Sequence, residues 1–132
     1  MTLSYLDHVN IRTTRLEALS AFYQDVLGLS PGPRPPFAVN GAWLYCGERA
    51  AVHLVEVAEM PDSPAPRLEH FAFRAEGIDV FLAHLAAQGV ACDITDVPGW
   101  GIRQVNIHDP DGNHIEIAFE LKETEPKVED VT

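Results

Sequence analysis

Residues 6–12 read LDHVNIR, and the same pattern returns 62 positions later at residues 68–74, which read LEHFAFR. In both copies a leucine precedes an acid, a histidine and an alternation of apolar and other side chains, and each copy ends at an arginine. Alternation of this kind is typical of a half-buried β-strand. An internal repeat at this distance predicts that one supersecondary unit occurs twice in the chain.

Each copy is followed by a helical pattern. Apolar residues recur at close to the 3.6-residue period over 16–27 and again over 80–87. A glycine stands where each pattern ends, Gly28 in the first half and Gly89 in the second. Because glycine adopts the left-handed conformation that ends many helices, both helices are predicted to stop there.

Short runs rich in β-forming residues come after each helix. They lie at 42–46 and 51–57 in the first half, and at 102–108 and 114–119 in the second. Asp111-Gly112 is a hairpin signal between the last two runs. We therefore predict an α+β fold in which each half is a strand, a helix and then about three strands.

Proline clusters punctuate the chain. Pro31, Pro33, Pro35 and Pro36 predict one loop, and the stretch 58–66 predicts a linker between the halves. The expected organisation is a single domain over 1–132, with modules at about 4–57 and 67–120. The charged tail at 121–132 is short and expected to fray.

Composition excludes several classes of protein. A length of 132 residues suits one ordinary domain. The net charge is −11, from 9 Lys and Arg against 20 Asp and Glu, so nucleic acid and anionic membranes are poor partners. The sequence has no secretory-type start and no apolar run of membrane length. Its two cysteines, Cys46 and Cys92, are expected to be small core residues. We therefore predict a reduced, cytoplasmic setting.

Strand parity gives the first indication of chemistry. Successive side chains point to opposite faces of a strand, so four metal-capable groups are predicted on the face away from the helices: His8, His53, His70 and Glu116. His8 and His70 are related by the repeat, and His53 and Glu116 by nearly the same spacing. Imidazole and carboxylate suit Zn, Fe, Ni, Co or Mn, and two histidines with one carboxylate also describe the open iron site of oxygenases.

Three further histidines are weaker candidates. His114 has the parity of Glu116 but lies about 7 Å from it along the strand, so a surface or interface role is favoured. His84 on a helix and His108 at a strand end are not expected to bind metal. His53 stays open between a metal ligand and an acid or base beside the metal.

The chain resembles the vicinal oxygen chelate superfamily, which groups glyoxalase I, bleomycin-resistance proteins, extradiol dioxygenases and fosfomycin-resistance transferases. The matching segments are LDHVNIRT with AFYQDVLGL, AVHLVEV, LEHFAFR and GIRQVNIHDPDGNHIEI. The resemblance implies two βαβββ modules whose curved mixed sheets form a cleft, with the helices on the outer face. It also implies a divalent metal ion on His8, His53, His70 and Glu116, and a homodimer with shared sites.

The resemblance leaves several activities open. A glyoxalase-like isomerase or lyase that chelates a small substrate through adjacent oxygens is the leading one, with Glu116 and His53 as catalytic groups. Glyoxalase I usually has a carboxylate or amide where this chain has His53, which makes lactoylglutathione a doubtful substrate. The alternatives are an Fe(II) extradiol dioxygenase, a fosfomycin-type thiol transferase, and a non-catalytic bleomycin-type drug-binding protein.

Parity and loop position also suggest substrate-binding residues. Arg12 and Arg74 are candidates to hold a carboxylate or phosphate. Asn10 and Gln104 share the face of the histidines, and Trp100 and Phe37 are candidates to line the site from loops. The alternative for the arginines is a solvated strand end, and for the aromatic rings a loop plug onto the core.

Overall fold

The computed structural model describes residues 1, 4–62 and 68–121. Its contacts divide the chain into two compact units, Met1–Ser63 and Pro64–Thr132, called here the first and second unit. Residues 63–66 of the predicted linker and 122–132 of the predicted tail lie outside the described residues.

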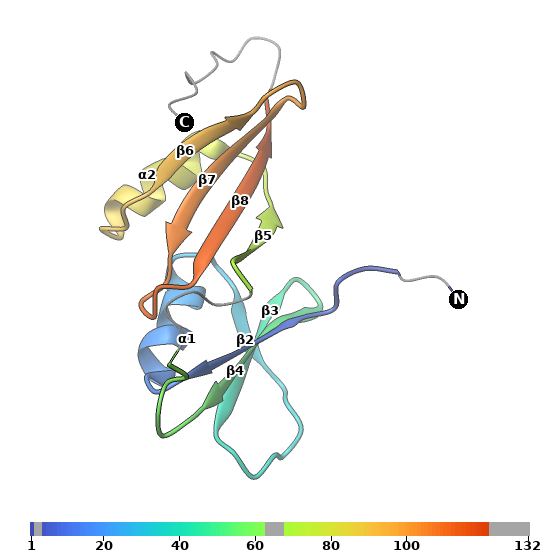
Figure 1. Cartoon of the computed structure of the whole chain (residues 1–132), viewed down its shortest axis with the longest axis vertical. Coiled ribbons are helices and arrows are strands. Elements are labelled where there is room, and N and C mark those ends of the chain that lie inside the picture. The colour runs from blue at the N-terminus through green and yellow to red at the C-terminus, as the bar shows by residue number, and fades with distance from the viewer. Residues whose placement is uncertain (2–3, 63–67, 122–132) are drawn as a thin grey trace. The chain divides into compact units, whose positions relative to one another are not determined.

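The first unit contains one helix and one four-stranded sheet (Figure 1). Its elements are β1 (Val9–Thr13), α1 (Leu16–Asp25), β2 (Ser30–Gly32), β3 (Gly41–Cys46) and β4 (Arg49–Glu56). The strand order is β1-β4-β3-β2, with β1 parallel to β4 and the other pairs antiparallel.

The second unit repeats this topology. Its elements are β5 (His70–Arg74), α2 (Ile78–Ala87), β6 (Asp93–Val97), β7 (Ile102–His108) and β8 (His114–Glu120). The order β5-β8-β7-β6 again pairs the first and last strands in parallel. The predicted α+β fold with two βαβββ modules is confirmed.

The core of each unit lies on the helix side of its sheet. In β4, Val52 and Leu54 are fully buried, and α1 packs on β3 and β4. In β8, Ile115 and Ile117 are buried, and Phe119 contacts Phe81 of α2. This alternation is the one that strand parity predicts, so the opposite face of each sheet is available for polar groups.

The short strands β2 and β6 were not predicted individually. Pro31 lies within β2, where we expected only a loop. β2 is the edge strand of its sheet, and an edge strand tolerates proline because the missing N–H can lie on the side that pairs with no strand. The expectation of core cysteines is wrong for Cys46, which is exposed, while Cys92 is half-buried. Within the described ranges neither helix is long and apolar enough to cross a membrane.

The turn between β7 and β8 is held by Asp109. Its buried carboxylate accepts hydrogen bonds from the backbone N–H of Asp111 (3.0 Å) and Asn113 (2.9 Å), and from Nδ2 of Asn113 (2.8 Å). Gly112 has a φ of +85°, which favours glycine. This turn fixes a register in which Glu116 pairs with Asn106.

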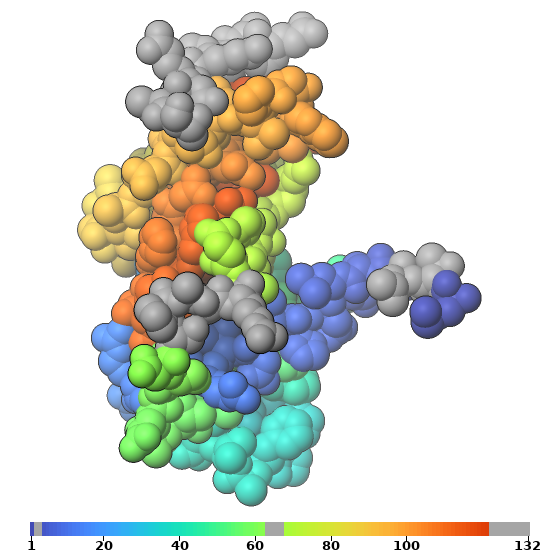
Figure 2. Space-filling model, viewed as in Figure 1, coloured from blue at the N-terminus to red at the C-terminus, as the bar shows by residue number. Residues whose placement is uncertain are grey.

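Residues 4–8, directly before β1, belong to the first unit. In the space-filling view they stand out from the rest of that unit (Figure 2). Tyr5 and Leu6 on this segment are exposed. His8 lies directly before β1, so this candidate ligand is at the point where the segment joins the sheet.

Candidate functional site

In the second unit, two of the predicted ligands come together. His70 begins β5, and Glu116 lies on the adjacent strand β8. Nε2 of His70 is 3.5 Å from Oε2 of Glu116, whose side chain is only 14% exposed. Gln104 on β7 donates from Nε2 to the same carboxylate oxygen at 3.0 Å. Gln104, which we predicted near the site, therefore orients Glu116.

The other nitrogen of His70 faces a residue that strand parity did not single out. Nδ1 of His70 hydrogen-bonds to Oε2 of Glu69. The second oxygen of Glu69 lies 3.1 Å from Nδ1 of His114, and the ligand atoms of these three residues all lie within 4.8 Å of one another. The group is thus a possible His/Glu metal site within the second unit.

Glu69 and the histidines shift each other's protonation. Hydrogen bonds from His70 and His114 lower the pKa of Glu69. The hydrogen bond to Glu69 raises the pKa of His70, and the nearby Glu116 carboxylate acts in the same direction. Glu69 is therefore an ionised acceptor at neutral pH.

His114 lies near the predicted ligand His70 through strand pairing, although it is distant from Glu116 along its own strand. Across the parallel ladder His114 pairs with His70, and their ring centroids are 5.2 Å apart. Its Nε2 also lies 2.9 Å from Oδ1 of Asn106. Only the register between β5 and β8 places His114 beside His70, and the predicted order of strands does not give that register.

In the first unit the two predicted histidine ligands stack. The rings of His8 and His53 have centroids 3.9 Å apart and are 13° from parallel. Trp43, the cross-strand neighbour of His53 on β3, stacks on its other face at 4.0 Å. Burial lowers the pKa of His53, with the charge of His8 acting in the same direction, so His53 is held neutral.

The acid before each histidine makes the same contact in both units. Nδ1 of His8 lies 2.7 Å from Oδ2 of Asp7, as Nδ1 of His70 lies against Glu69. An imidazole that donates Nδ1–H to a carboxylate leaves the lone pair of Nε2 free to bind a metal ion. The repeat therefore reproduces an oriented ligand as well as a strand.

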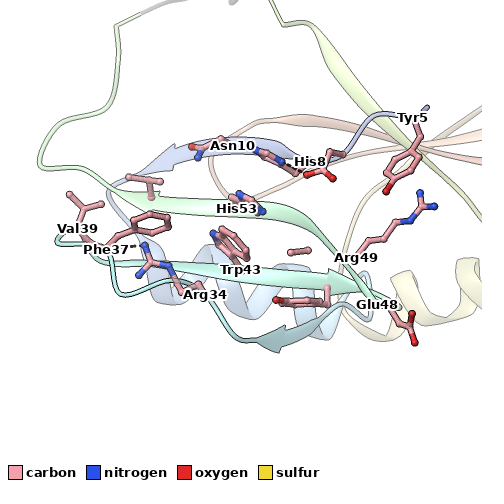
Figure 3. Close-up of a pocket in the computed structure, with 14 residues that line it drawn as sticks. Tyr5, His8, Asn10, Arg34, Phe37, Val39, Trp43, Glu48, Arg49 and His53 are labelled. Carbon is pink, nitrogen blue, oxygen red and sulfur yellow. Dashed lines mark hydrogen bonds and ion pairs between the residues drawn. The ribbon is translucent and has the colours of Figure 1, made fainter. Parts of the chain in front are cut away.

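A pocket of about 610 Å³ opens on the histidine face of the first unit (Figure 3). His8, His53 and the predicted Asn10 line it. Trp43 and Arg34 also line it, and neither was predicted from the sequence. Phe37, predicted to line a site from its loop, does so here.

The remaining predicted residues lie elsewhere on their units. Arg12 is exposed on β1 and is not among the residues that line the pocket. Arg74 pairs with Glu120 at 3.6 Å and borders a second hollow at the start of α2. Trp100 is 75% exposed in the turn between β6 and β7 and lines neither hollow.

Comparison with known proteins finds a matching family model and a similar protein of known name. The model of the Glyoxalase/Bleomycin resistance protein/Dioxygenase superfamily matches residues 5–117. A protein named Glyoxylase I 4 from Arabidopsis thaliana is 32% identical over 124 residues, which are 88% of this chain and 71% of that protein.

Two solved structures are similar in fold and sequence. The crystal structure of a putative glyoxalase family protein from Bacillus anthracis has a TM-score of 0.73 and 27% identity, covering 91% of this chain and 98% of that one. TnmS3, an antibiotic binding protein from Streptomyces sp. CB03234, has a TM-score of 0.70 and 26% identity, with the same coverage.

Proposed function

Since the chain belongs to the Glyoxalase/Bleomycin resistance protein/Dioxygenase superfamily, we propose that it is a metal-dependent enzyme that chelates a small substrate through two adjacent oxygens. One divalent ion would take His8 and His53 from a first unit and His70 and Glu116 from a second. Both units are needed to complete this set, from one chain or from the two chains of a homodimer. Cys46 and Cys92 form no disulfide, which agrees with the cytoplasmic setting that we propose.

The observation that carries this proposal is the repeated acid–histidine contact. In each unit a carboxylate accepts Nδ1–H of the proposed ligand, at 2.7 Å for Asp7 and His8. In the second unit the free Nε2 then faces Glu116 at 3.5 Å. Outer carboxylates of this kind fix the ring orientation and raise the basicity of metal-bound histidines.

The donor chemistry fits a divalent ion. Histidine must be neutral to donate to a metal, and His53 is held neutral by burial. Three imidazoles and one carboxylate suit Zn, Fe, Ni, Co or Mn. Bound there, the ion would supply Lewis acidity toward a carbonyl or alkoxide oxygen.

The leading reaction is an isomerase or lyase step in which a proton leaves or joins a carbon beside the chelated oxygens. Glu116 is the only acid among the four proposed ligands, and Gln104 holds its carboxylate at 3.0 Å. Glu116 would accept the proton and, as the carboxylic acid so formed, return it to the adjacent carbon. If His53 does not bind the ion, this buried, neutral imidazole would instead accept the proton and return it as an imidazolium. Proton transfer by positioned groups contributes about 10²–10⁴-fold in rate.

A non-catalytic drug-binding protein is the alternative from another class, and similarity to the antibiotic binding protein TnmS3 favours it. The net charge of −11 suits a cationic drug, but two arginines, Arg34 and Arg49, line the pocket itself. An Fe(II) dioxygenase or a thiol transferase remains an enzymatic alternative on the same ligand set.

Elemental analysis of anaerobically purified protein tests the proposal, with His70→Ala and Glu116→Gln as ligand variants and His84→Ala as a matched histidine control. We expect stoichiometric metal in the wild type and the control, and loss of it in both ligand variants. Absence of metal from the wild type, even after reconstitution, would contradict the enzyme proposal and favour the drug-binding one.

His53→Ala separates the enzymatic alternatives. Stoichiometric iron retained without His53 would favour a facial triad, and assays would turn to catechols with oxygen. Nickel, zinc, cobalt or manganese lost with His53 would favour four-ligand isomerase chemistry, assayed with thiol-conjugated 2-oxoaldehydes.

A further inference from the structure

We propose that the pocket of the first unit binds a planar organic carboxylate, with the carboxylate held by Arg34 and the conjugated plane packed against Phe37 and Trp43. This proposal rests on the proposed function, because the planar carboxylate would be the part of the substrate that lies away from the metal. The proposed substrate class is therefore a conjugated organic anion.

Arg34 is a charged group without a countercharge. It is half-buried in a loop whose neighbouring residues are exposed. Its Nη2 donates to the backbone oxygen of Val39 at 3.2 Å, and its Nε is buried without a hydrogen bond. Among the described residues no carboxylate lies within ion-pair distance of it. Uncompensated burial of a cation is costly, and a ligand carboxylate would offset that cost.

Arg34 and the proposed metal ligand His53 line the same pocket, and Trp43 is drawn between them in Figure 3. An anion bound at Arg34 would therefore lie in the same hollow as His53.

The second arginine of the pocket is a poorer anchor. Arg49 is exposed, and its guanidinium lies over the ring of Tyr5 at 3.8 Å (Figure 3). Solvent screens an exposed charge strongly, so a carboxylate gains less there than at the half-buried Arg34. The two arginines thus form a matched pair for experiment.

Aromatic groups form the wall beside Arg34. Its guanidinium carbon lies 5.2 Å from the ring centroid of Phe37, and Phe37 lies 6.4 Å from Trp43. Val39 and Val55 also line the pocket. A flat conjugated ligand gains more from aromatic neighbours than a saturated one of equal size. The volume of about 610 Å³ suits a small organic molecule.

The test is a ligand-observed NMR titration of the 132-residue chain after EDTA treatment. Three probes are compared: trans-cinnamate, its neutral isostere trans-cinnamamide, and the saturated acid 3-cyclohexylpropanoate. We expect the wild type to prefer cinnamate over the amide by about tenfold, as for a hydrogen bond to a charged group. It should prefer cinnamate over the saturated acid by about threefold, as for an aromatic contact.

Three variants test whether Arg34 is the source of the preference for the acid. Arg34→Gln should bring the ratio of acid to amide close to one, while Arg49→Gln, with the same change of charge in the same pocket, should keep it. Arg34→Lys should keep part of it, because the cation remains without the guanidinium fork. Thermal unfolding checks that each variant is folded.

Three results would overturn the proposal. The wild type could fail to bind cinnamate at millimolar concentration, Arg34→Gln could weaken acid and amide equally, or Arg49→Gln could be the variant that removes the preference. Equal weakening would mean that Arg34 only holds its loop through Val39. Because the titration is free of metal, its failure is distinguishable from a failure of metal binding.

Discussion

Replacing Glu69 by glutamine should weaken metal binding although Glu69 is not one of the four proposed ligands. In the structure its carboxylate accepts Nδ1–H of His70 and also contacts His114. The side-chain amide of the Glu69→Gln variant could still accept a hydrogen bond from one ring, but without the charge that raises the basicity of Nε2. Loss of such an outer carboxylate costs about 10–100-fold in metal affinity.

The exposure of the contact sets the expected size within that range. The side chain of Glu69 is 71% exposed and that of Asp7 is 76% exposed, so water screens both carboxylates. We therefore expect the lower end, about tenfold, for Glu69→Gln and also for Asp7→Asn. Glu116→Gln, which removes a ligand whose side chain is 14% exposed, should cost far more.

Competition between the protein and a chromophoric chelator for Zn²⁺ at pH 7.5 measures these affinities. Glu120→Gln is the matched control, because it makes the same charge change on an exposed acid of the same unit that pairs with Arg74 at 3.6 Å. If Glu69→Gln binds as tightly as this control while Glu116→Gln loses the metal, the acid before each histidine does not orient the ligand.

Three further predictions concern stability and protonation. Asp96→Ala should lower the free energy of unfolding in urea by about 3 kcal/mol, because Arg103 then keeps a buried charge without its bidentate partner, and a cost below about 1 kcal/mol would contradict this. Gly112→Ala should cost about 1–2 kcal/mol, since φ is +85° and nothing crowds an added Cβ, and an unchanged melting temperature would refute the strain. In the metal-free protein, NMR should find the pKa of His53 below its ordinary value of 6.5 and the pKa of His70 above it. The contribution of His53 to stability then falls as the pH drops below 6.5. The contribution of His70 is full below pH 6.5 and is lost as the pH rises through its raised pKa. Titration of both histidines at 6.5 would be evidence against the burial of His53 and the contact of His70 with Glu69.

The face on which each candidate ligand lies could be predicted from the sequence. Strand parity depends only on the period of two, and the buried Val52 and Ile115 confirm the side that packs on the helices. The repeat of an acid and a histidine at residues 7–8 and 69–70 was equally visible. These features are local, so no knowledge of strand pairing was required.

What depends on register or on loops could not be predicted. His114 meets Glu69 and His70 only because β8 lies parallel to β5 in one particular alignment. Arg34 reaches the pocket from a proline-rich loop that has no periodicity to interpret. Strand β2, three residues long and containing Pro31, is too short to be distinguished from a turn.

The stack of Trp43 on His53 gives the protein an optical reporter of its own pocket. The chain has two tryptophans, and the other, Trp100, is 75% exposed in the second unit. In a Trp100→Phe background the remaining emission would come from the indole 4.0 Å from the His53 ring. Protonation of that imidazole, metal on it, or a ligand beside it would each change the fluorescence of this one residue, so occupancy could be followed without a label.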